Sequence, residues 1–426
     1  MNPMRLLTRR WAGVALVGGL LAACDPFSVQ DPSRYTDAAL DSALTSVADG
    51  VEGQFQLILD DFVIYQSLLA DEWRHTGTWI QYEDADKGRA RYANSPGDFI
   101  FNTLLRARFS SQDAQARFAK PGVALANTDL KVVQVKSVEA WVDLYLGEGF
   151  CEAPAEPGGP AVSDNAMLDQ AITKLTAARD AAQQGGLTDF VRWNNAGLAR
   201  ANLLRGNYAA AAAAANLVPD GFSKVAKFSQ TNISQNNWVV LTNTVGFNKA
   251  AGMREKWWPM VDTIAGLLRD PWSGQLDSRV PISHPPKSLG VDGNTQHYSQ
   301  FKYKGLGDDL PITDSQEMRL IEAEVAWRNN DLTTAMAKMD ALRAAVGLNA
   351  LPATTDPATV FSYLLHEYFA EQFMEGHRLT HIRRFNLITS LLGAGRLTKY
   401  PLSQFEALYN VNIEDDLALR CAPVSS

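Results

Sequence analysis

The chain has 426 residues, of which 46% are hydrophobic and 20% charged, and its formal net charge is −8. These proportions are those of an ordinary globular protein, and they exclude the disordered, collagen-like and disulfide-dense classes. Nucleic acid is not an expected partner of so acidic a chain, because duplex binding needs a basic face.

Residues 1–23 have the features of a secretory signal peptide. A start with three arginines and no acid precedes the apolar run 11–21, which is too short to span a bilayer as a stable helix. Small residues then lead directly to Cys24, in a pattern that resembles a bacterial lipobox. We therefore expect cleavage before Cys24 and attachment of acyl chains such as palmitate to it. The alternative is an ordinary signal peptide with an incidental cysteine.

The mature chain, residues 24–426, is predicted to form a single domain anchored by lipid, because no later segment has 18 uninterrupted apolar residues. It contains two further cysteines, Cys151 and Cys421. Export places them where disulfides persist, so one bridge from the middle of the chain to its end is predicted. Two unrelated buried thiols are the alternative.

Helical periodicity dominates the chain. Apolar residues recur three and four positions apart in the segments 58–69, 138–145, 168–175 and 361–368. Strand patterns are scarce, and 238–241 and 301–303 are the short candidates. The sequence therefore predicts a mainly α fold with long irregular loops and a few short strands.

Two segments, 200–215 and 323–337, each read as a helix, a tight polar turn and a second helix. The turns align at Gly206 and Asn330, and a small alanine follows each of them, at Ala211 and Ala335. A residue that accepts positive φ and an alanine that lets two helices approach closely are typical of tetratricopeptide-like helix pairs. A tetratricopeptide-like helical array is therefore expected.

Aromatic residues gather with polar ones in the segment 71–84, which follows a predicted helix. We predict that this segment is a loop and that Trp73, Trp79 and Tyr82 bind a ligand, because flat aromatic rings cover the apolar faces of sugars. The alternative is that single aromatics of this group cover the core. A second candidate cluster comprises Trp257, Trp258 and Trp272, whereas Trp141 and Trp327 lie on helix faces that predict core positions.

The sequence contains few of the motifs that would indicate an enzymatic site. His377 and His381 have the i, i+4 spacing of a zinc pair, but the H-E-x-x-H motif is missing, so helix packing is the preferred interpretation and no metal is predicted. The acidic pairs at 60–61, 71–72 and 83–84 are candidates for glycosidase carboxylates, although adjacent acids are usually solvated helix ends or caps. No nucleophile or phosphate-binding motif is present, so no catalytic residue and no cofactor is predicted.

Residues 367–384, EYFAEQFMEGHRLTHIRR, resemble the signature of the SusD/RagB family of outer-membrane nutrient-binding lipoproteins. Tyr368 and Phe369 replace the usual arginines and His381 the usual aspartate, as in a divergent member. Weaker similarities lie at 138–149, 277–279, 318–327, 344–351 and 400–410. The positions that match the signature are Glu367, Glu371, Glu375, Gly376, His377, Arg378 and Arg384.

The resemblance implies a SusD-like helical array with four tetratricopeptide-like helix pairs. It also implies a lipoprotein of the outer membrane, facing the cell surface, that binds an oligosaccharide or a peptide. Such a protein delivers its ligand to a TonB-dependent SusC-like transporter and is not an enzyme. Two other functions stay open: a tetratricopeptide-like scaffold that binds proteins, and a lipid-anchored glycoside hydrolase.

Overall fold

In a computed structural model of the chain, residues 36–89, 95–244, 248–283 and 288–413 are described. They fall into a short unit that ends at Leu44 and contains α2 (Asp37–Ser42), and a large unit that begins at Thr45. The predicted signal peptide, Cys24 and Cys421 lie outside the described residues. Within those residues, no helix has both the length and the apolar character needed to cross a membrane.

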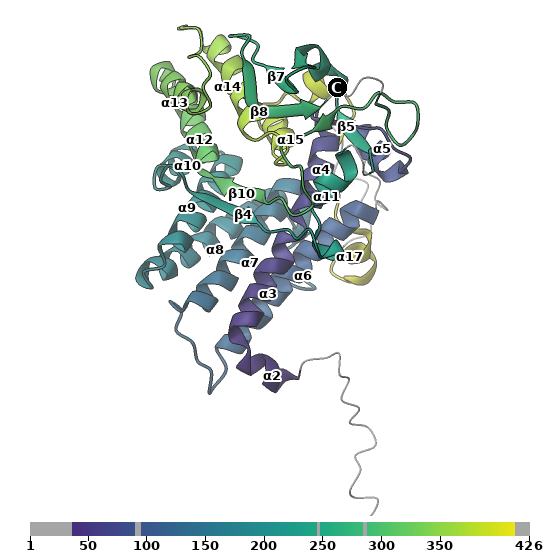
Figure 1. Cartoon of the computed structure of the whole chain (residues 1–426). Coiled ribbons are helices and arrows are strands. Elements are labelled where there is room, and N and C mark those ends of the chain that lie inside the picture. The colour runs from purple at the N-terminus through teal and green to yellow at the C-terminus, as the bar shows by residue number, and fades with distance from the viewer. Residues whose placement is uncertain (1–35, 90–94, 245–247, 284–287, 414–426) are drawn as a thin grey trace, which may run out of the picture. The chain divides into compact units, whose positions relative to one another are not determined.

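Most of the large unit is a series of helices in which sequence neighbours pack side by side (Figure 1). Contacts run from α6 through α7, α8 and α9 to α10, continue to α12, and end with α13 and α14. This arrangement confirms the mainly α, tetratricopeptide-like prediction. The helices are α6 (Ser95–Phe118), α7 (Leu130–Gly149), α8 (Asp164–Gln184), α9 (Thr188–Arg205), α10 (Tyr208–Ala215), α12 (Ser315–Arg328), α13 (Leu332–Ala345) and α14 (Pro357–Glu371).

Both predicted helix turns are present. Gly206 ends α9 with φ of 79°, and Asn330 lies between α12 and α13 with φ of 60°. The alanines that follow, Ala211 and Ala335, are fully buried, as close packing of each helix pair requires. The sequence thus specified these turns locally, through one residue that tolerates a left-handed backbone and one small side chain.

The helices not yet named precede α6, lie between α10 and α12, or follow α14 in the chain. They are α3 (Leu44–Gln56), α4 (Leu59–Leu69), α5 (Ile80–Asp86), α11 (Trp238–Asn243), α15 (Arg378–Arg384), α16 (Ile388–Leu392) and α17 (Gln404–Tyr409), with the 3₁₀ turns η1 (Ile233–Gln235) and η2 (Glu255–Met260).

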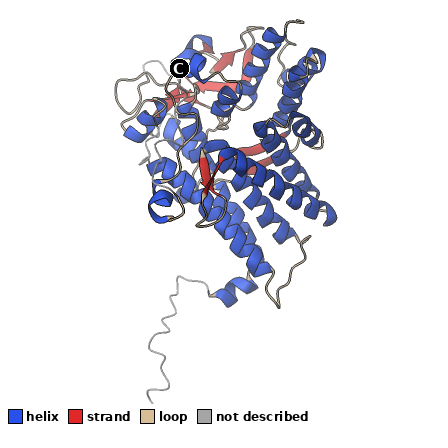
Figure 2. Cartoon of the chain, turned by 180° about the vertical axis from the view of Figure 1, so that it is seen from behind, coloured by secondary structure: helices blue, strands red, loops and turns tan. Residues whose placement is uncertain are grey.

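Strands form only small antiparallel sheets among the helices (Figure 2). The pairs are β1 (Trp73–His75) with β5 (Ala251–Met253), β2 (Glu152–Pro154) with β3 (Ala161–Ser163), and β4 (Ser223–Ala226) with β10 (Leu310–Asp314). The remaining sheet has the order β6 (Val261–Asp262), β7 (Leu267–Arg269), β8 (Leu276–Ser283) and β9 (Ser299–Gln300).

Two strand predictions are corrected. Residues 238–241 lie in helix α11, because the side chain of Asn237 accepts hydrogen bonds from the backbone N–H groups of Val239 and Val240 and caps the helix. Residues 301–303 follow β9 and form no strand themselves. The β-branched residues Val239 and Val240 favour a strand, but the local cap at Asn237 begins a helix instead.

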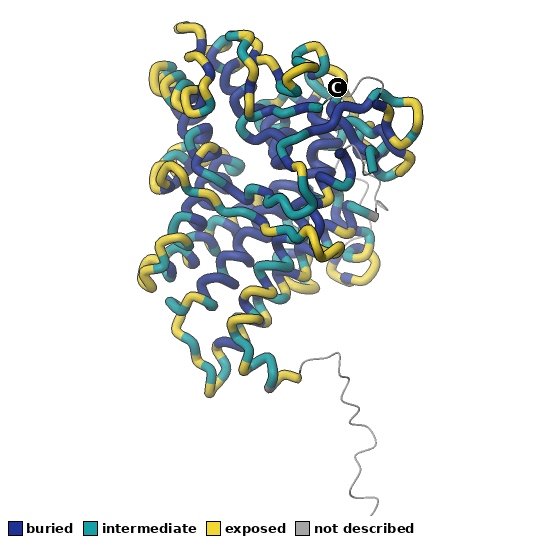
Figure 3. Tube along the Cα trace, in the orientation of Figure 1, coloured by how far each residue is buried: buried dark blue, intermediate teal, exposed yellow. Residues whose placement is uncertain are grey.

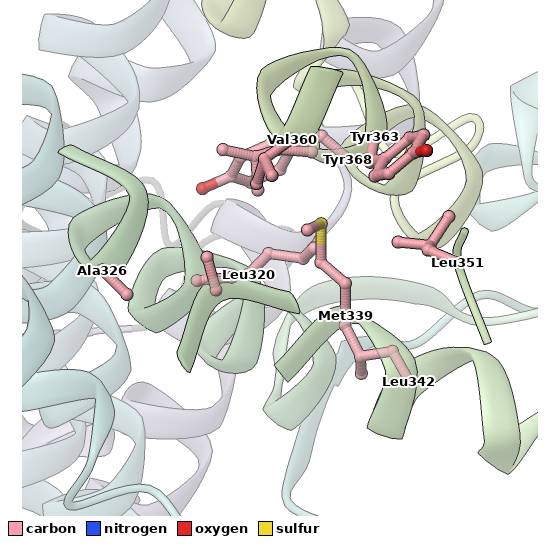
Figure 4. Close-up of a cluster of buried hydrophobic side chains, with 11 residues drawn as sticks. Leu320, Ala326, Met339, Leu342, Leu351, Val360, Tyr363 and Tyr368 are labelled. Atoms are coloured by element: carbon pink, nitrogen blue, oxygen red, sulfur yellow. The ribbon is translucent and has the colours of Figure 1, made fainter. Parts of the chain in front are cut away.

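Buried backbone runs through the centre of the large unit, and exposed backbone concentrates at helix ends and loops (Figure 3). One core cluster joins α12, α13 and α14, where Leu320, Met339 and Val360 meet (Figure 4). Trp141 is fully buried, as predicted, and stacks on Trp193 with ring centroids 5.8 Å apart. Complete burial of a large apolar side chain such as phenylalanine stabilises a fold by about 1.5–3 kcal/mol.

The signature segment 367–384 is held by charged partners in the interior. The pairs are Glu367 with Arg343 at 2.6 Å, Glu371 with Arg279 at 2.8 Å, Glu375 with Lys302 at 2.6 Å, His377 with Glu148 at 3.0 Å, Arg378 with Asp71 at 2.7 Å, and Arg384 with Glu324. His381 Nε2 lies 2.6 Å from Gln372 Oε1. The signature residues therefore connect elements of the fold to one another.

Candidate functional site

The segment 71–84 differs from the loop that the sequence predicted. It begins with the short strand β1 and ends in helix α5. Two buried acids fix its start, because Asp71 pairs with Arg378, and Glu72 accepts hydrogen bonds from Ser67 Oγ at 3.0 Å and from the backbone N–H of Met374 at 3.1 Å. The segment is thus tied to the signature region and to the end of α4.

Trp73 is fully buried and pairs with Met253 across the β1–β5 ladder. The prediction that it contacts a ligand is therefore corrected: its ring belongs to the core, which was the alternative for single aromatics of this group. The cause is the partner strand β5, which the sequence of the segment itself does not reveal.

Trp79 and Tyr82 are brought together at the start of α5. Their ring centroids lie 5.0 Å apart, and the rings meet edge to face with an interplanar angle of 80°. Trp79 is 38% exposed, whereas Tyr82 is 5% exposed. Both line a cavity of about 730 Å³, which is in the size range of small-ligand sites.

Further aromatic and polar side chains complete this cavity. Phe99 in α6 and Trp238 at the start of α11 are 55% and 41% exposed, and both line it. The aromatic residues therefore leave ring surface available to a ligand. The other lining residues are Gln54, Leu57, Asp61, Tyr65, Gln81, Pro96, Thr103, Arg106, Ser234 and Asn236.

The buried carboxylate of Asp60 positions Trp238. Its Oδ2 accepts a hydrogen bond of 2.8 Å from the backbone N–H of Trp238, and its Oδ1 accepts one of 2.9 Å from the backbone N–H of Asp61. Burial, together with the neighbouring charge of Asp61, raises the pKa of Asp60. The acid thus holds the first residue of α11 against helix α4, 178 positions away in the chain.

Sequence reasoning found Trp79 and Tyr82 but missed Phe99, Asp61 and Tyr65 as parts of one cavity. Trp238 entered the sequence analysis only as the first residue of the strand candidate 238–241. No local pattern links these residues, since they come from α4, α5, α6 and α11. The one available signal was that Phe99 and Trp238 are large aromatics beside polar residues.

The second predicted cluster consists of packed rings. Trp257 stacks on Phe369 with centroids 3.8 Å apart, and Trp258 stacks on Tyr298 at 4.6 Å. Trp272 meets Tyr363 edge to face at 4.8 Å. None of the three tryptophans lines the cavity. Trp257 and Trp272 therefore pack against helix α14, whereas Trp258 packs against the residue before β9.

One buried cluster has the composition of a metal site. Single ligand atoms of Asp270, His366 and Glu367 lie within 4.8 Å of one another. However, Arg343 Nη1 lies 2.9 Å from Asp270 Oδ1 and 2.6 Å from Glu367 Oε1, and Arg279 Nη1 lies 2.6 Å from Glu367 Oε2, so both carboxylates are already paired with guanidinium groups. Burial lowers the pKa of His366 to about 4. The cluster is a structural ion pair in the geometry described.

Most of the acidic residues considered for catalysis already form hydrogen bonds or ion pairs within the fold. Asp71 and Glu72 are buried in the contacts given above, and Glu83 forms an exposed ion pair with Lys87. Among the described residues that line the cavity, Asp61 is the single carboxylate. A glycosidase of the usual kind needs two carboxyl groups on opposite sides of the sugar.

Solved structures similar to this chain share its fold at low sequence identity. A SusD superfamily protein from Bacteroides vulgatus is 13% identical, with a TM-score of 0.65, over 83% of this chain and 89% of that one. A SusD-like carbohydrate binding protein from Bacteroides fragilis is 13% identical, with a TM-score of 0.62, over 92% and 94%. A laminarin binding SusD-like protein is 15% identical, with a TM-score of 0.56, over 87% and 98%.

The family model described as the SusD family matches residues 315–416, which contain the signature segment. Comparison with curated proteins found no match. The resemblance seen in the sequence is thereby confirmed: the chain has the SusD-like fold, and residues 315–416 carry the sequence pattern of the SusD family.

Proposed function

We propose that the chain is a surface-exposed outer-membrane lipoprotein that binds an oligosaccharide in the cavity and delivers it to a TonB-dependent SusC-like transporter. The single observation that carries this proposal is the exposure of Trp79, Phe99 and Trp238 around one cavity. Aromatic rings match the apolar faces of pyranose sugars, and the amide and hydroxyl groups beside them match the sugar hydroxyls.

The relatives support the nature of the ligand. Two neighbours in fold are a carbohydrate binding protein and a laminarin binding protein. The lipid anchor at Cys24, the surface location and the transporter partner rest on the lipobox and on the family resemblance. The fold neighbours, the lipobox and the family resemblance together favour a binding protein over an enzyme. The single carboxylate among the described lining residues agrees with this, because a glycosidase of the usual kind needs two.

The test is a binding screen of the purified full chain against glycans and peptides, followed by titration of the best ligand. Trp79→Ala and Trp238→Ala are each expected to weaken binding about tenfold or more, since exposed aromatic contacts dominate such interfaces. Phe109→Ala is the matched control, because Phe109 is a 59% exposed aromatic of α6 that does not line the cavity. Unchanged affinity in both tryptophan variants would place the ligand elsewhere.

The two alternative functions, a glycoside hydrolase and a protein-binding scaffold, predict different outcomes of these binding and capture experiments. A hydrolase would release shorter products from the bound oligosaccharide, whereas a binding protein returns it intact. A protein scaffold would bind no glycan, and its capture from membranes would not enrich a large TonB-dependent barrel. Recovery of that barrel with the chain supports delivery to a transporter.

A further inference from the structure

Asp61 occupies an unusual position in the cavity. It is partly buried in helix α4, it lines the cavity, and no described residue forms an ion pair or side-chain hydrogen bond with its carboxylate. The neighbouring Asp60 is 1% exposed and is also without a described cationic partner, since its hydrogen bonds come from two backbone N–H groups. Asp61 in the cavity lining and its buried neighbour Asp60 therefore both lack a basic side chain as an ion-pair partner among the described residues.

The hydroxyl of Tyr65 adds an independent observation. Tyr65 is 1% exposed and lines the same cavity one helical turn after Asp61, yet its Oη has no hydrogen-bond partner among the described residues. Leaving such a buried group unsatisfied costs about 1–3 kcal/mol. A ligand group that enters here can meet both the carboxylate of Asp61 and the hydroxyl of Tyr65.

We infer that Asp61 sets the charge selectivity of the cavity, which takes neutral or amino-bearing sugars and rejects acidic ones. This inference rests on the proposed function. A carboxylate accepts hydrogen bonds from sugar hydroxyls or from an ammonium group, but it repels a uronic acid at the same position. Because the Asp61–Tyr65 end is withdrawn from solvent, that repulsion is screened less than it would be at the surface.

The other charged and titratable groups around Asp61 are consistent with this assignment. Arg106 lines the cavity but is exposed, so solvent and salt weaken its attraction for an acidic ligand. Tyr65, Tyr82 and the adjoining Tyr400 are buried phenols, and burial raises the pKa of each, so they stay neutral. Among the described residues, the carboxylate that lines this end of the cavity is therefore that of Asp61, with the buried Asp60 next to it in the chain.

The charge selectivity of the cavity should depend on pH. Burial raises the pKa of Asp61 above its ordinary value. The carboxylate is therefore ionised at pH 8 and becomes progressively neutral as the pH falls toward 5. Uronic acids keep their charge across this range, because the pKa of such a carboxyl is about 3.5. Binding of an acidic sugar should therefore strengthen toward low pH, and binding of its neutral counterpart should change little.

The experiment uses the full chain and an array of neutral oligosaccharides of different linkages, each beside its C6-oxidised uronic acid and its 2-amino counterpart. At pH 8 the wild type should bind the neutral or amino form about tenfold or more tightly than the uronic acid, which is a free-energy difference of about 1.4 kcal/mol. Asp61→Asn preserves size and hydrogen bonding but removes the charge. It should bring the two affinities together and abolish the pH dependence.

Glu156→Gln is the matched control, since Glu156 is an exposed acid outside the cavity. In this variant, the ratio of the affinity for the neutral sugar to the affinity for its uronic acid should equal that of the wild type. Circular dichroism and melting temperature establish that Asp61→Asn is folded. A wild-type preference for uronic acids, or an unchanged ratio in folded Asp61→Asn, would overturn the inference while leaving glycan binding intact. Absence of binding to every glycan would instead remove the proposed function, and the inference with it.

Discussion

Arg378 and Asp71 are 307 positions apart in the chain and form a bidentate ion pair in the interior. Arg378 Nε lies 2.7 Å from Asp71 Oδ1, and Nη2 lies 3.0 Å from Oδ2. Arg378 belongs to the signature segment, and Asp71 begins the segment that carries Trp79. The pair therefore links the most specific sequence pattern of the chain to the wall of its candidate ligand site.

Removal of either partner should destabilise the protein strongly. Both side chains are at most 5% exposed, so Arg378→Ala leaves the carboxylate of Asp71 buried with Lys256 as its one remaining cationic partner among the described residues. Loss of one partner of a buried ion pair costs about 3–5 kcal/mol. Urea unfolding of Arg378→Ala measures this cost. A variant as stable as the wild type would show that the pair contributes little.

The same pair predicts a dependence of stability on pH. Burial alone would raise the pKa of Asp71, but the charge and hydrogen bonds of Arg378, with the charge of Lys256, hold this pKa well below its usual range. The stabilisation is therefore complete above the unfolded-state pKa of aspartate, about 3.9, and is lost as the pH falls through the lower folded-state value. Unfolding free energies of the wild type and Asp71→Asn, measured from pH 7 downward, should converge in acid. A constant difference would contradict the assignment.

The two tryptophans of the 71–84 segment should respond in opposite ways to truncation. Trp73→Ala removes a fully buried ring and should cost about 3–5 kcal/mol of stability. Trp79→Ala removes a 38% exposed ring and should leave the melting temperature nearly unchanged while weakening ligand binding. Parallel thermal unfolding and ligand titration separate the two effects. If Trp73→Ala were fully stable, the core assignment of this residue would be wrong.

This contrast shows what the sequence could and could not predict. The helices and the turns at Gly206 and Asn330 depend on residues within a few positions of each other, so local patterns found them. Trp73 lies opposite Met253 in the β1–β5 ladder, and the backbone of Trp238 is held by Asp60, 178 positions away. Contacts over such separations leave no periodic trace in either partner, and the cavity depends on them because its lining includes residues of α4, α5, α6 and α11.

Gly376 is required by both its conformation and its surroundings. Its φ is 81°, and a Cβ atom there would lie 3.1 Å from the Cα of Val63. Left-handed backbone costs an alanine about 1–2 kcal/mol, and the backbone contact should add to this. Gly158 is the matched control, since it has φ of 70° with nothing within 4 Å of the added Cβ. Gly376→Ala should therefore lower the melting temperature more than Gly158→Ala, and equal losses would argue against the contact.

Cys151 is disulfide-bonded, and its predicted partner is Cys421. Non-reducing peptide mapping should recover the two residues in one cross-linked peptide. Closure of a loop of about 270 residues stabilises a protein by roughly 5 kcal/mol at most in the chain-entropy model. Cys421→Ser should therefore expose one reactive thiol at Cys151 and lower the unfolding temperature. Recovery of Cys421 as a free thiol in the unreduced wild type would refute the pairing.

The lipid anchor can be tested apart from the fold. Cleavage before Cys24 should leave this cysteine diacylated or triacylated, because a single acyl chain gives only marginal membrane binding. Cys24→Ser should then move the protein from the membrane fraction to the soluble fraction, as no helix among the described residues can span a bilayer. Ligand binding by the released variant should equal that of the wild type, since the cavity is formed by residues 54–238. A Cys24→Ser protein that stays fully membrane-bound would show that another element, and not the lipobox, holds the chain at the membrane.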